Sequence, residues 1–334
     1  MTGETVIWYF NSNKNPWPDR TTADSNSIEW TKYRDVEIDL IEEAYQEKKS
    51  YVLLDRYRID FAHFIQISLA DETKQRPIKR ETCNSRIECL RENRFGSTLT
   101  IESAPSISLG RFDSWCPFLT AWFSCPFGKR AITDFTKCIE ACAQGIVKEA
   151  VLHDSHSRAE AAYMAEKICQ SSKKSRVEAA MQCIRFYTKD SFLYYVLNQA
   201  LRKHDCSKLE TLGPLCYIIR NYSRIAQDYI GMVYRGTDLS HAEIEVYKQH
   251  IGEWKTWPAY TSTSKDRTMA EMFGKILFII DITDVELSSP RAYDIAHLSQ
   301  YPDEKEVLIP AGVSFQILGV EQDLSQKTII HVKI

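Results

Sequence analysis

The sequence of 334 residues predicts an α+β protein, and three observations lead to this prediction. Residues 6–80 read as short strands around a single helix, residues 157–220 read as helices, and residues from 231 onward read as short strands. Helices followed by strands in one stretch of chain are typical of an α+β domain. The length favours about two domains, and an apolar fraction of 44% is sufficient for ordinary buried cores.

Residues 6–80 predict a small module that is dominated by a sheet. Apolar or alternating runs predict its strands, and one run of helical periodicity predicts its helix. The strands are expected at 6–10, 28–33, 51–54 and 62–67, and the helix at 37–48. Between residues 10 and 28 the chain is rich in Asn, Pro, Asp, Ser and Thr, which is typical of a long surface loop.

Residues 81–150 predict a connecting segment that packs on the C-terminal domain. The segment starts with charged residues and then becomes aromatic, and an aromatic-rich segment buries its rings where it can. The aromatic residues are Phe112, Trp115, Phe118, Trp122, Phe123 and Phe127. The expected division of the chain is therefore 1–80, 81–150 and 151–334.

Helix and strand signals predict the order of the elements in the C-terminal domain. Serine and glutamate three residues apart form a capping-box pattern at Ser157–Glu160 and at Ser175–Glu178, so a helix is expected after each serine. Further helices are expected at 190–201 and 212–220, and strands at 232–234, 259–262, 276–281, 306–309, 314–318 and 328–332. Ser264 is expected to cap a short helix that ends at Gly274.

Charge and apolar patterning exclude several classes of partner. Lys and Arg number 42 against 45 Asp and Glu, so neither direct nucleic-acid binding nor membrane-surface binding is expected. No apolar run approaches the roughly 20 residues of a membrane span, and the N-terminus lacks a signal-peptide pattern. The sequence therefore predicts an intracellular protein, cytoplasmic or nuclear, that is not secreted.

The ten cysteines are expected to be free thiols, because no secretion signal points to an oxidising compartment. Cys138 and Cys142 are spaced i and i+4 in an expected helix and could share a metal with His153 and His156. No other closely spaced Cys or His pattern completes such a site. We therefore expect buried thiols, surface histidines and no metal.

Three short segments carry the residues for chemistry on a dinucleotide: Tyr234–Gly236, Thr261–Ser264 and Glu304–Glu306. Breaking the bond between ribose and nicotinamide in NAD creates an oxocarbenium-like sugar. An enzyme must then hold the diphosphate, fix the nicotinamide and place negative charge beside the ribose. Each segment offers one of these functions, although each pattern alone is more often a surface feature.

The first two segments suit binding and orientation. Arg235 at a strand end can bind phosphate oxygens bidentately, and Gly236 leaves room for backbone groups to pair with the nicotinamide carboxamide. Ser262, Thr263 and Ser264 stand at another strand end, where alternate hydroxyls face one side and can orient a carboxylate. An ordinary turn with a helix cap is the alternative for these hydroxyls.

The third segment supplies two carboxylates. Glu306 begins an expected strand, and Glu304 points to the same face if the extended geometry reaches back that far. A carboxylate pair at this spacing is usually solvated charge. The order of the three segments, with intervals of roughly 27 and 42 residues, is what favours a common site.

This arrangement resembles the arginine-serine-glutamate class of ADP-ribosyltransferases over about residues 155–332. The resemblance implies a helical part followed by a two-sheet β core, and NAD⁺ as a substrate with no metal. It implies that Arg235 binds NAD, that Ser262 supports the catalytic Glu306, and that Glu304 selects the acceptor. Glu306 then contacts the nicotinamide ribose and stabilises the cation.

The acceptor implied by the resemblance is a protein with an exposed arginine. A charged guanidinium is a poor nucleophile, so a carboxylate such as Glu304 that orients it and receives its proton favours arginine. Phe273 is a candidate for the nicotinamide pocket, with helix-to-sheet packing as the alternative. Enzymes that elongate poly(ADP-ribose) begin this site with histidine and glycine rather than Arg235 and Gly236, so chain elongation is not expected.

A second resemblance covers residues 5–80. Two tryptophans and a glutamate have the spacing that names the WWE domain family, namely Trp8, Trp30 and either Glu42 or Glu43. The resemblance implies a half-barrel sheet with one helix that binds poly(ADP-ribose) or iso-ADP-ribose. Trp8 and Trp30 have core packing as an alternative role.

The ligand-facing half of this module is expected in the run that contains Tyr57, Gln66 and Arg76. An aromatic ring, Trp8 or Tyr57, would lie against adenine, Gln66 would bond its polar edges, and Arg76 would donate to a phosphate. The loop between residues 10 and 28 departs from the compact family form and could reshape one wall of the pocket.

Three functions follow from the sequence. The first is an intracellular mono-ADP-ribosyltransferase that modifies protein arginine, releases nicotinamide and is directed by its N-terminal module to poly(ADP-ribose). The second is an NAD glycohydrolase, in which water replaces the acceptor. The third is a catalytically silent adaptor that binds ADP-ribose polymers, against which the Glu304 and Glu306 pair weighs.

Overall fold

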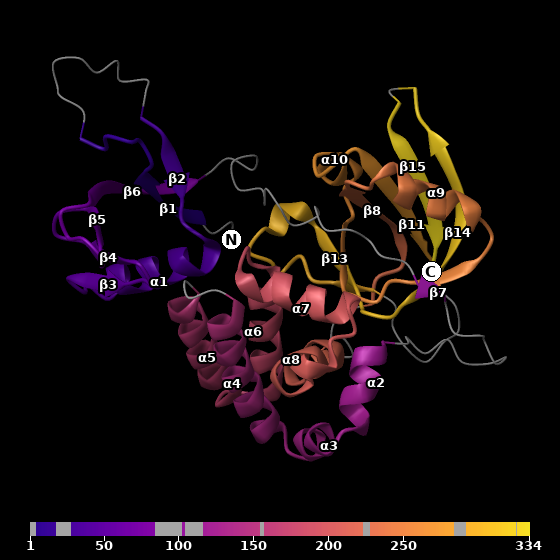
Figure 1. Ribbon diagram of the computed structural model, residues 1–334, viewed down its shortest axis with the longest axis horizontal. Coiled ribbons are helices and arrows are strands. Elements are labelled where there is room, and N and C mark those ends of the chain that lie inside the picture. The colour runs from indigo at the N-terminus through magenta and orange to yellow at the C-terminus, as the bar shows by residue number, and fades with distance from the viewer. Residues whose placement is uncertain are drawn as a thin grey trace.

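The computed structural model describes residues 5–17, 28–83, 102–103, 116–153, 157–222, 228–283, 292–324 and 326–334. Figure 1 shows an N-terminal sheet with one helix, a group of helices in the middle, and a C-terminal sheet. This α+β arrangement confirms the fold class that the sequence predicts. Within the described residues, no helix combines the length and the apolar character that a bilayer span needs.

The N-terminal module is a six-stranded antiparallel sheet in the order β2-β1-β6-β5-β4-β3, with helix α1 packed on it. The strands are β1 (Thr5–Asn11), β2 (Trp30–Lys32), β3 (Tyr51–Leu53), β4 (Tyr57–Asp60), β5 (Ile65–Ser68) and β6 (Gln75–Cys83), and α1 is Asp35–Gln46. Strands β4 and β6 are absent from the sequence prediction. Their polar residues hide the strand pattern, and β6 contains Pro77, a residue that is uncommon inside strands.

A buried tryptophan and an ion pair fix α1 to this sheet. Trp8 Nε1 donates to Glu42 Oε2 at 2.8 Å, and Arg80 donates to both Glu42 oxygens at 2.9 and 2.8 Å. Bonding to Arg80 is the largest cause that lowers the pKa of Glu42 to about 2. Glu42 is therefore the glutamate that serves the sheet, whereas Glu43 contacts Tyr163 outside the module.

The helical part contains seven helices in the described chain. They are α2 (Pro117–Ser124), α3 (Pro126–Thr133), α4 (Phe135–His153), α5 (Arg158–Ser172), α6 (Arg176–Thr188), α7 (Phe192–Arg202) and α8 (Leu209–Tyr222), with the short turn η1 (Cys206–Lys208) before α8. Phe118 and Trp122 of α2 lie in the same core as α4–α8, and the ring centroids of Trp122 and Tyr217 are 5.1 Å apart. Phe112 and Trp115 of the aromatic segment lie outside the described residues.

One of the two expected capping boxes is replaced by a contact from the N-terminal module. Ser175 accepts from the Glu178 amide at 3.0 Å, as predicted. Ser157 makes no such bond, and the carboxylate of Asp55 in the β3–β4 turn accepts from the Ala159 amide at 3.1 Å. Glu160 pairs with Arg34 at 3.4 Å instead of bonding back to Ser157. The prediction of a capping box at Ser157–Glu160 was wrong, because the carboxylate of Asp55 caps α5 instead.

The C-terminal sheet has the strand order β12-β13-β10-β8-β11-β15-β14-β9-β7. Its strands are β7 (Glu102–Ser103), β8 (Gly231–Thr237), β9 (Trp254–Thr256), β10 (Thr261–Ser264), β11 (Ile276–Ile282), β12 (Tyr293–Asp294), β13 (Glu306–Ile309), β14 (Ser314–Gln322) and β15 (Thr328–Lys333). Helices α9 (His241–Gln249) and α10 (Arg267–Glu271) lie against it. The ladder between β10 and β8 has one residue pair, Ser264 with Tyr234. The two sheets that the resemblance implies are therefore two parts of one sheet, β12-β13-β10 and β8-β11-β15-β14-β9-β7. We call the junction of β8 and β10 the corner.

Burial of Glu160 at the start of α5 makes stability depend on pH. Burial, with a contribution from Glu37, raises the pKa of Glu160 to about 8. The folded protein then binds this proton more tightly than the unfolded chain, so stability falls as pH rises from about 4.3, the ordinary glutamate value, to about 8. Glu160→Gln should raise the thermal unfolding midpoint of the protein at about pH 9 and change it little at about pH 4. Equal shifts at both pH values would contradict the assignment.

Candidate active site

Arg235 on β8 reaches across the corner of the sheet to β10. Its Nη1 donates to the carbonyl oxygen of Ser262 at 2.8 Å. Strand β10 pairs with β13, so that Ser264 lies opposite Glu306 and Ser262 opposite Leu308. Paired residues of an antiparallel ladder face the same side, which places Ser262, Ser264 and Glu306 on one face. The structure thus brings the three sequence segments to one corner.

The candidate side chains at this corner are shielded from water. Arg235 is 2% exposed, Ser262 0%, Glu304 2% and Glu306 1%. A charge in such a position interacts strongly with its neighbours, because little solvent screens it. A ligand can therefore reach these side chains only if the region opens.

Two tyrosines of the helical part lie beside the corner. The pKa of Tyr187 is raised first by burial and then by Tyr194, and the charges of Glu306 and Arg235 act on it in opposite directions. Tyr187 contacts the rings of Tyr194 and Tyr260, each at a centroid distance of 5.4 Å.

Helix α7 contributes residues that the sequence analysis did not single out. Asn198 donates to the Tyr187 hydroxyl at 3.1 Å and is fully buried. Tyr194, Asn198 and Arg202 stand at i, i+4 and i+8 and share one face of α7. This polar stripe in an apolar helix was a readable signal. Burial lowers the pKa of Arg235, and the nearby charge of Arg202 lowers it further.

The hydroxyls of β10 have different tasks. Thr263 Oγ1 donates to the Val307 carbonyl at 2.7 Å, and Ser264 Oγ donates to the Glu304 carbonyl at 2.7 Å. Ser262 Oγ is buried and has no hydrogen-bond partner among the residues that the structure describes. An unpaired buried hydroxyl is costly, so a group that binds at this corner would gain from it. Of the three, Ser262 best fits contact with a ligand or a carboxylate.

The helix after β10 is capped by an aspartate rather than by the predicted serine. Asp266 accepts from the amides of Thr268 and Met269 at 3.1 and 3.4 Å. Ser264 Oγ accepts from the Asp266 amide at 2.9 Å and thereby fixes the turn between strand and helix. The expectation that Ser264 caps this helix was wrong, because its hydroxyl is engaged with Glu304 and Asp266.

The carboxylate pair lies on a tight turn and not on one extended strand. Glu304 ends the 3₁₀ turn η2 (Pro302–Glu304), and Lys305 has a left-handed backbone with φ of 47° before β13 begins at Glu306. Lys305 Nζ bonds to Asp266 at 3.1 Å, which holds this conformation. The extended geometry that would place Glu304 on the face of Glu306 therefore does not reach back to Glu304, although both carboxylates are buried.

Gly236 allows β8 to approach helix α10. A Cβ at this position would lie 1.9 Å from the Ala270 carbonyl oxygen, which is far inside van der Waals contact. Phe273, just after α10, is partly buried and lies near the same glycine. The close packing gives Gly236 a structural task in addition to the ligand contact expected from the sequence.

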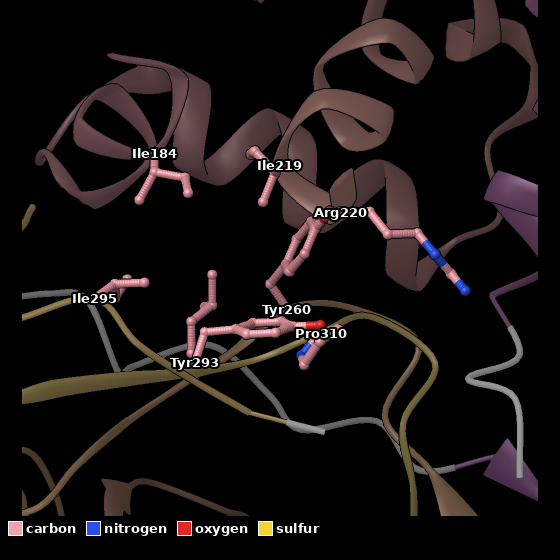
Figure 2. A pocket seen from close by; sticks show the side chains of 8 residues that line it. Ile184, Ile219, Arg220, Tyr260, Tyr293, Ile295 and Pro310 are labelled. Atoms are coloured by element: carbon pink, nitrogen blue, oxygen red, sulfur yellow. The ribbon is translucent and has the colours of Figure 1, made fainter. Parts of the chain in front are cut away.

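A small, mainly apolar hollow lies between the helical part and β13. It is lined by Ile184, Ile219, Arg220, Tyr260, Tyr293, Ile295, Leu308 and Pro310. Figure 2 shows the rings of Tyr260 and Tyr293 below Ile219, with the Arg220 side chain extending away. The hollow lies beside the corner, since Leu308 is two residues after Glu306, but the predicted site residues do not line it.

In the N-terminal module, the structure buries two of the four predicted ligand contacts. Trp8 is 0% exposed and lies in the core, so a ligand contact at this ring does not fit the structure. Gln66 is 2% exposed and accepts from the buried Tyr33 hydroxyl at 2.6 Å, so its side chain is already engaged inside the module. Tyr57 is partly buried. Arg76 Nη1 donates to the carbonyls of Asn11 and Asn13, at the end of β1 and the start of the first loop.

The possible metal ligands do not gather. No group of three or more His, Cys, Asp or Glu suited to a metal occurs among the described residues. Cys138 and Cys142 are buried in the helical core, and the His153 ring stacks on Phe192. His156 lies outside the described residues.

The corner and its α+β frame agree with the class of ADP-ribosyltransferases. The family model described as NAD:arginine ADP-ribosyltransferase matches residues 140–333, more than half of the chain, and the chain therefore belongs to this family. The model of the WWE domain matches residues 6–80, so the N-terminal module is a WWE domain.

A curated relative and several solved structures are similar to parts of the chain. A Mycobacterium avium (strain 104) protein, provisionally named NAD(+)--arginine ADP-ribosyltransferase Mav, is 37% identical over 105 residues, 31% of this chain. The match spans only 12% of that relative's length.

Three solved structures of bacterial proteins are similar to the chain. Exoenzyme S from Pseudomonas aeruginosa, solved with human 14-3-3 protein beta and carba-NAD, has a TM-score of 0.41 and 19% identity, covering 58% of this chain and 88% of its own. The effector XopAI from Xanthomonas axonopodis pv. citri has a TM-score of 0.44 and 15% identity, and the match covers 65% of this chain and 95% of the XopAI chain. HopU1 of Pseudomonas syringae pv. Tomato DC3000 has a TM-score of 0.40 and 19% sequence identity, and the match covers 51% of this chain and 82% of HopU1.

The contact at Gly236 predicts a stability effect. Gly236→Ala should lower the free energy of unfolding by about 1–3 kcal/mol, because the added methyl must push β8 away from α10. Denaturant unfolding measures this change. Gly319→Ala is the matched control in another strand of the same sheet, because a Cβ there meets nothing within 4 Å. Equal losses in both variants would show that the contact with Ala270 is unimportant.

Proposed function

We propose that the protein is an NAD-dependent mono-ADP-ribosyltransferase that transfers ADP-ribose to protein arginine and releases nicotinamide. The observation that carries this proposal is the hydrogen bond from Arg235 to Ser262, together with the β10–β13 register that brings Glu306 to the same corner. The family membership supports the reaction class. The WWE domain is proposed to bind poly(ADP-ribose) or iso-ADP-ribose and so direct the enzyme.

The buried corner suits stabilisation of a sugar cation. As the bond between ribose and nicotinamide breaks, the electron pair leaves with nicotinamide and positive charge develops on the ribose. Glu306 would hold that charge and bond to the ribose hydroxyl, and Ser262 Oγ would orient the carboxylate. A carboxylate fixed in a site without water stabilises such a charge far better than one in solution. The 1% exposure of Glu306 supports this role.

Two guanidinium groups suit the diphosphate of NAD. Arg235 is the first candidate, and Arg202 lies near enough for its charge to lower the pKa of Arg235. Two like charges in a buried region repel each other, and a bound diphosphate would relieve that repulsion. Gly236 and Phe273 remain the candidates for the nicotinamide end. Thr263 and Ser264 are assigned to support β13 and its preceding turn.

The acceptor would be oriented by Glu304. Its carboxylate would bond to the incoming guanidinium and take a proton as the new N-glycosidic bond forms. The turn at η2 ends on Glu304, and its backbone is fixed by Ser264. The domains proposed for this activity are the WWE domain of residues 1–80 and a catalytic unit that includes helices α2–α4, because these helices share the core of the catalytic helices.

Replacing the carboxylates separates the two steps. Glu306→Gln should lower nicotinamide release by on the order of a hundredfold or more, because a transition-state charge partner is lost, while NAD binding is retained. Glu304→Gln should abolish conjugation to agmatine, an arginine analogue, yet leave NAD hydrolysis. Chromatography of nicotinamide, free ADP-ribose and conjugate measures each product.

Each result has an opposite that refutes the assignment. Unchanged turnover in Glu306→Gln would remove Glu306 from catalysis. Loss of hydrolysis together with conjugation in Glu304→Gln would make Glu304 structural. Nicotinamide release by the wild type without any conjugate would make the protein an NAD glycohydrolase, and the absence of both would leave the adaptor function.

The WWE domain gives an independent test. Tyr57→Ala should weaken binding of iso-ADP-ribose by about tenfold or more, because stacking of a base on an aromatic ring is lost. Tyr51→Ala is the matched control, since Tyr51 is an exposed tyrosine on the neighbouring strand β3. Calorimetric titration measures both affinities. Equal affinity of the two variants would place the ligand elsewhere.

A further inference from the structure

Helix α1 of the WWE domain carries an acidic stripe, which we define as Asp35, Asp39 and Glu43. These residues are spaced at i, i+4 and i+8 and therefore lie on one side of the helix. Each contacts the catalytic part of the chain, where Figure 1 shows α1 beside α5 and the N-terminal end of α7. The stripe is thus a docking face within the protein and not a solvated surface.

Asp35 at the first position binds the segment before β13. The Tyr301 hydroxyl donates to the Asp35 carboxylate, with distances of 2.6 and 2.8 Å to its two oxygens. Lys32 Nζ donates to the same hydroxyl and to Asp35, each at 2.9 Å. The Asp190 amide also donates to Asp35 at 2.8 Å. Asp35 is 3% exposed, so this bonded group joins the two domains in a site that excludes water.

The charge of Asp35 is maintained despite its burial. Burial alone would raise the pKa of this carboxyl, but the charge of Lys32 and the hydrogen bonds from Tyr301 and Asp190 lower it below its usual value. Asp39, one turn later, pairs with Lys189 at 3.0 Å, and Lys189 donates to Gln300 at 2.8 Å. The acidic stripe therefore bonds to Tyr301 directly, through Asp35, and to Gln300 indirectly, through Asp39 and Lys189.

These two residues immediately precede the turn that ends on Glu304. The Glu304 amide donates to the Tyr301 carbonyl at 3.1 Å, so one 3₁₀ turn connects the anchored tyrosine to the carboxylate. A rigid turn transmits the position of its first residue to its last. Displacement of a catalytic group by about 1 Å can cost on the order of a hundredfold in rate.

We propose that Asp35 is a positioning residue for Glu304, so that the WWE domain is needed for transfer to arginine and not only for location. This inference rests on the proposed function of Glu304 as the acceptor-orienting carboxylate. Glu306 lies after Lys305 and is held by the β10–β13 ladder, independently of Tyr301. Loss of the Asp35 contact should therefore impair acceptor transfer and spare NAD hydrolysis.

The experiment compares three variants of the full chain. Tyr301→Phe removes one hydroxyl, Asp35→Ala removes the carboxylate, and the double variant removes both. Each should lower kcat/KM for agmatine by about tenfold, with hydrolysis of NAD in the absence of acceptor kept within about twofold. The double variant should lose no more than either single variant, because the two groups act through one contact.

Glu43→Ala is the matched control. Glu43 lies on the same stripe and bonds to Tyr163 and Lys167 of α5, away from the segment of Gln300 and Tyr301. Its loss should change neither reaction. If Glu43→Ala reduces agmatine transfer as much as Asp35→Ala, general docking explains the effect and the positioning role is refuted.

The remaining outcomes also decide the question. If Asp35→Ala proves unstable, the smaller change Tyr301→Phe supplies the result, and an unchanged ratio of conjugate to free ADP-ribose in that variant refutes the inference. A parallel loss of hydrolysis and transfer in folded Tyr301→Phe refutes it as well. Failure of the proposed function is distinct, because then the wild-type protein itself forms no conjugate.

Discussion

A hydrogen bond from the guanidinium of Arg235 to the carbonyl oxygen of Ser262 spans the corner of the C-terminal sheet. The ladder between β8 and β10 contains a single residue pair, so side-chain contacts must fix the angle between the two parts of the sheet. A buried guanidinium is costly to desolvate and is retained where its donors are used. In the proposed enzyme, this same group would bind the diphosphate, which couples the shape of the corner to the substrate.

The same helices contact both the corner and the WWE domain. The helices that bring Tyr187 and Tyr194 to the corner also present Lys189 and the Asp190 amide to the acidic stripe of α1. The segment between Tyr187 and Tyr194 therefore faces the corner at its ends and the WWE domain in its middle. In the proposed enzyme, opening of the corner for NAD would have to preserve or rearrange these interdomain bonds.

The sequence predicts most elements whose pattern is local, and it fails where a partner is distant. Periodicity predicts α1, which buries one face, and a short apolar run predicts β13, which is buried on both faces. The cap of α5 by Asp55 depends on a residue 104 positions away, which no local pattern reveals. The segments of Arg235, Ser262 and Glu306 follow from order and spacing, whereas the turn at Lys305 and the contact of Asp35 with Tyr301 exist only in three dimensions.

The most direct test of this account is calorimetric titration of NAD into the wild-type protein and into Arg235→Lys. The account predicts one NAD site per chain in the wild type and affinity that is at least about tenfold lower in the variant, because lysine cannot reproduce the planar, bidentate guanidinium. A thermal unfolding scan of the variant establishes that it is folded. Equal affinity of both proteins, or no binding of NAD by the wild type, would contradict the central claim that Arg235 holds the dinucleotide at this corner.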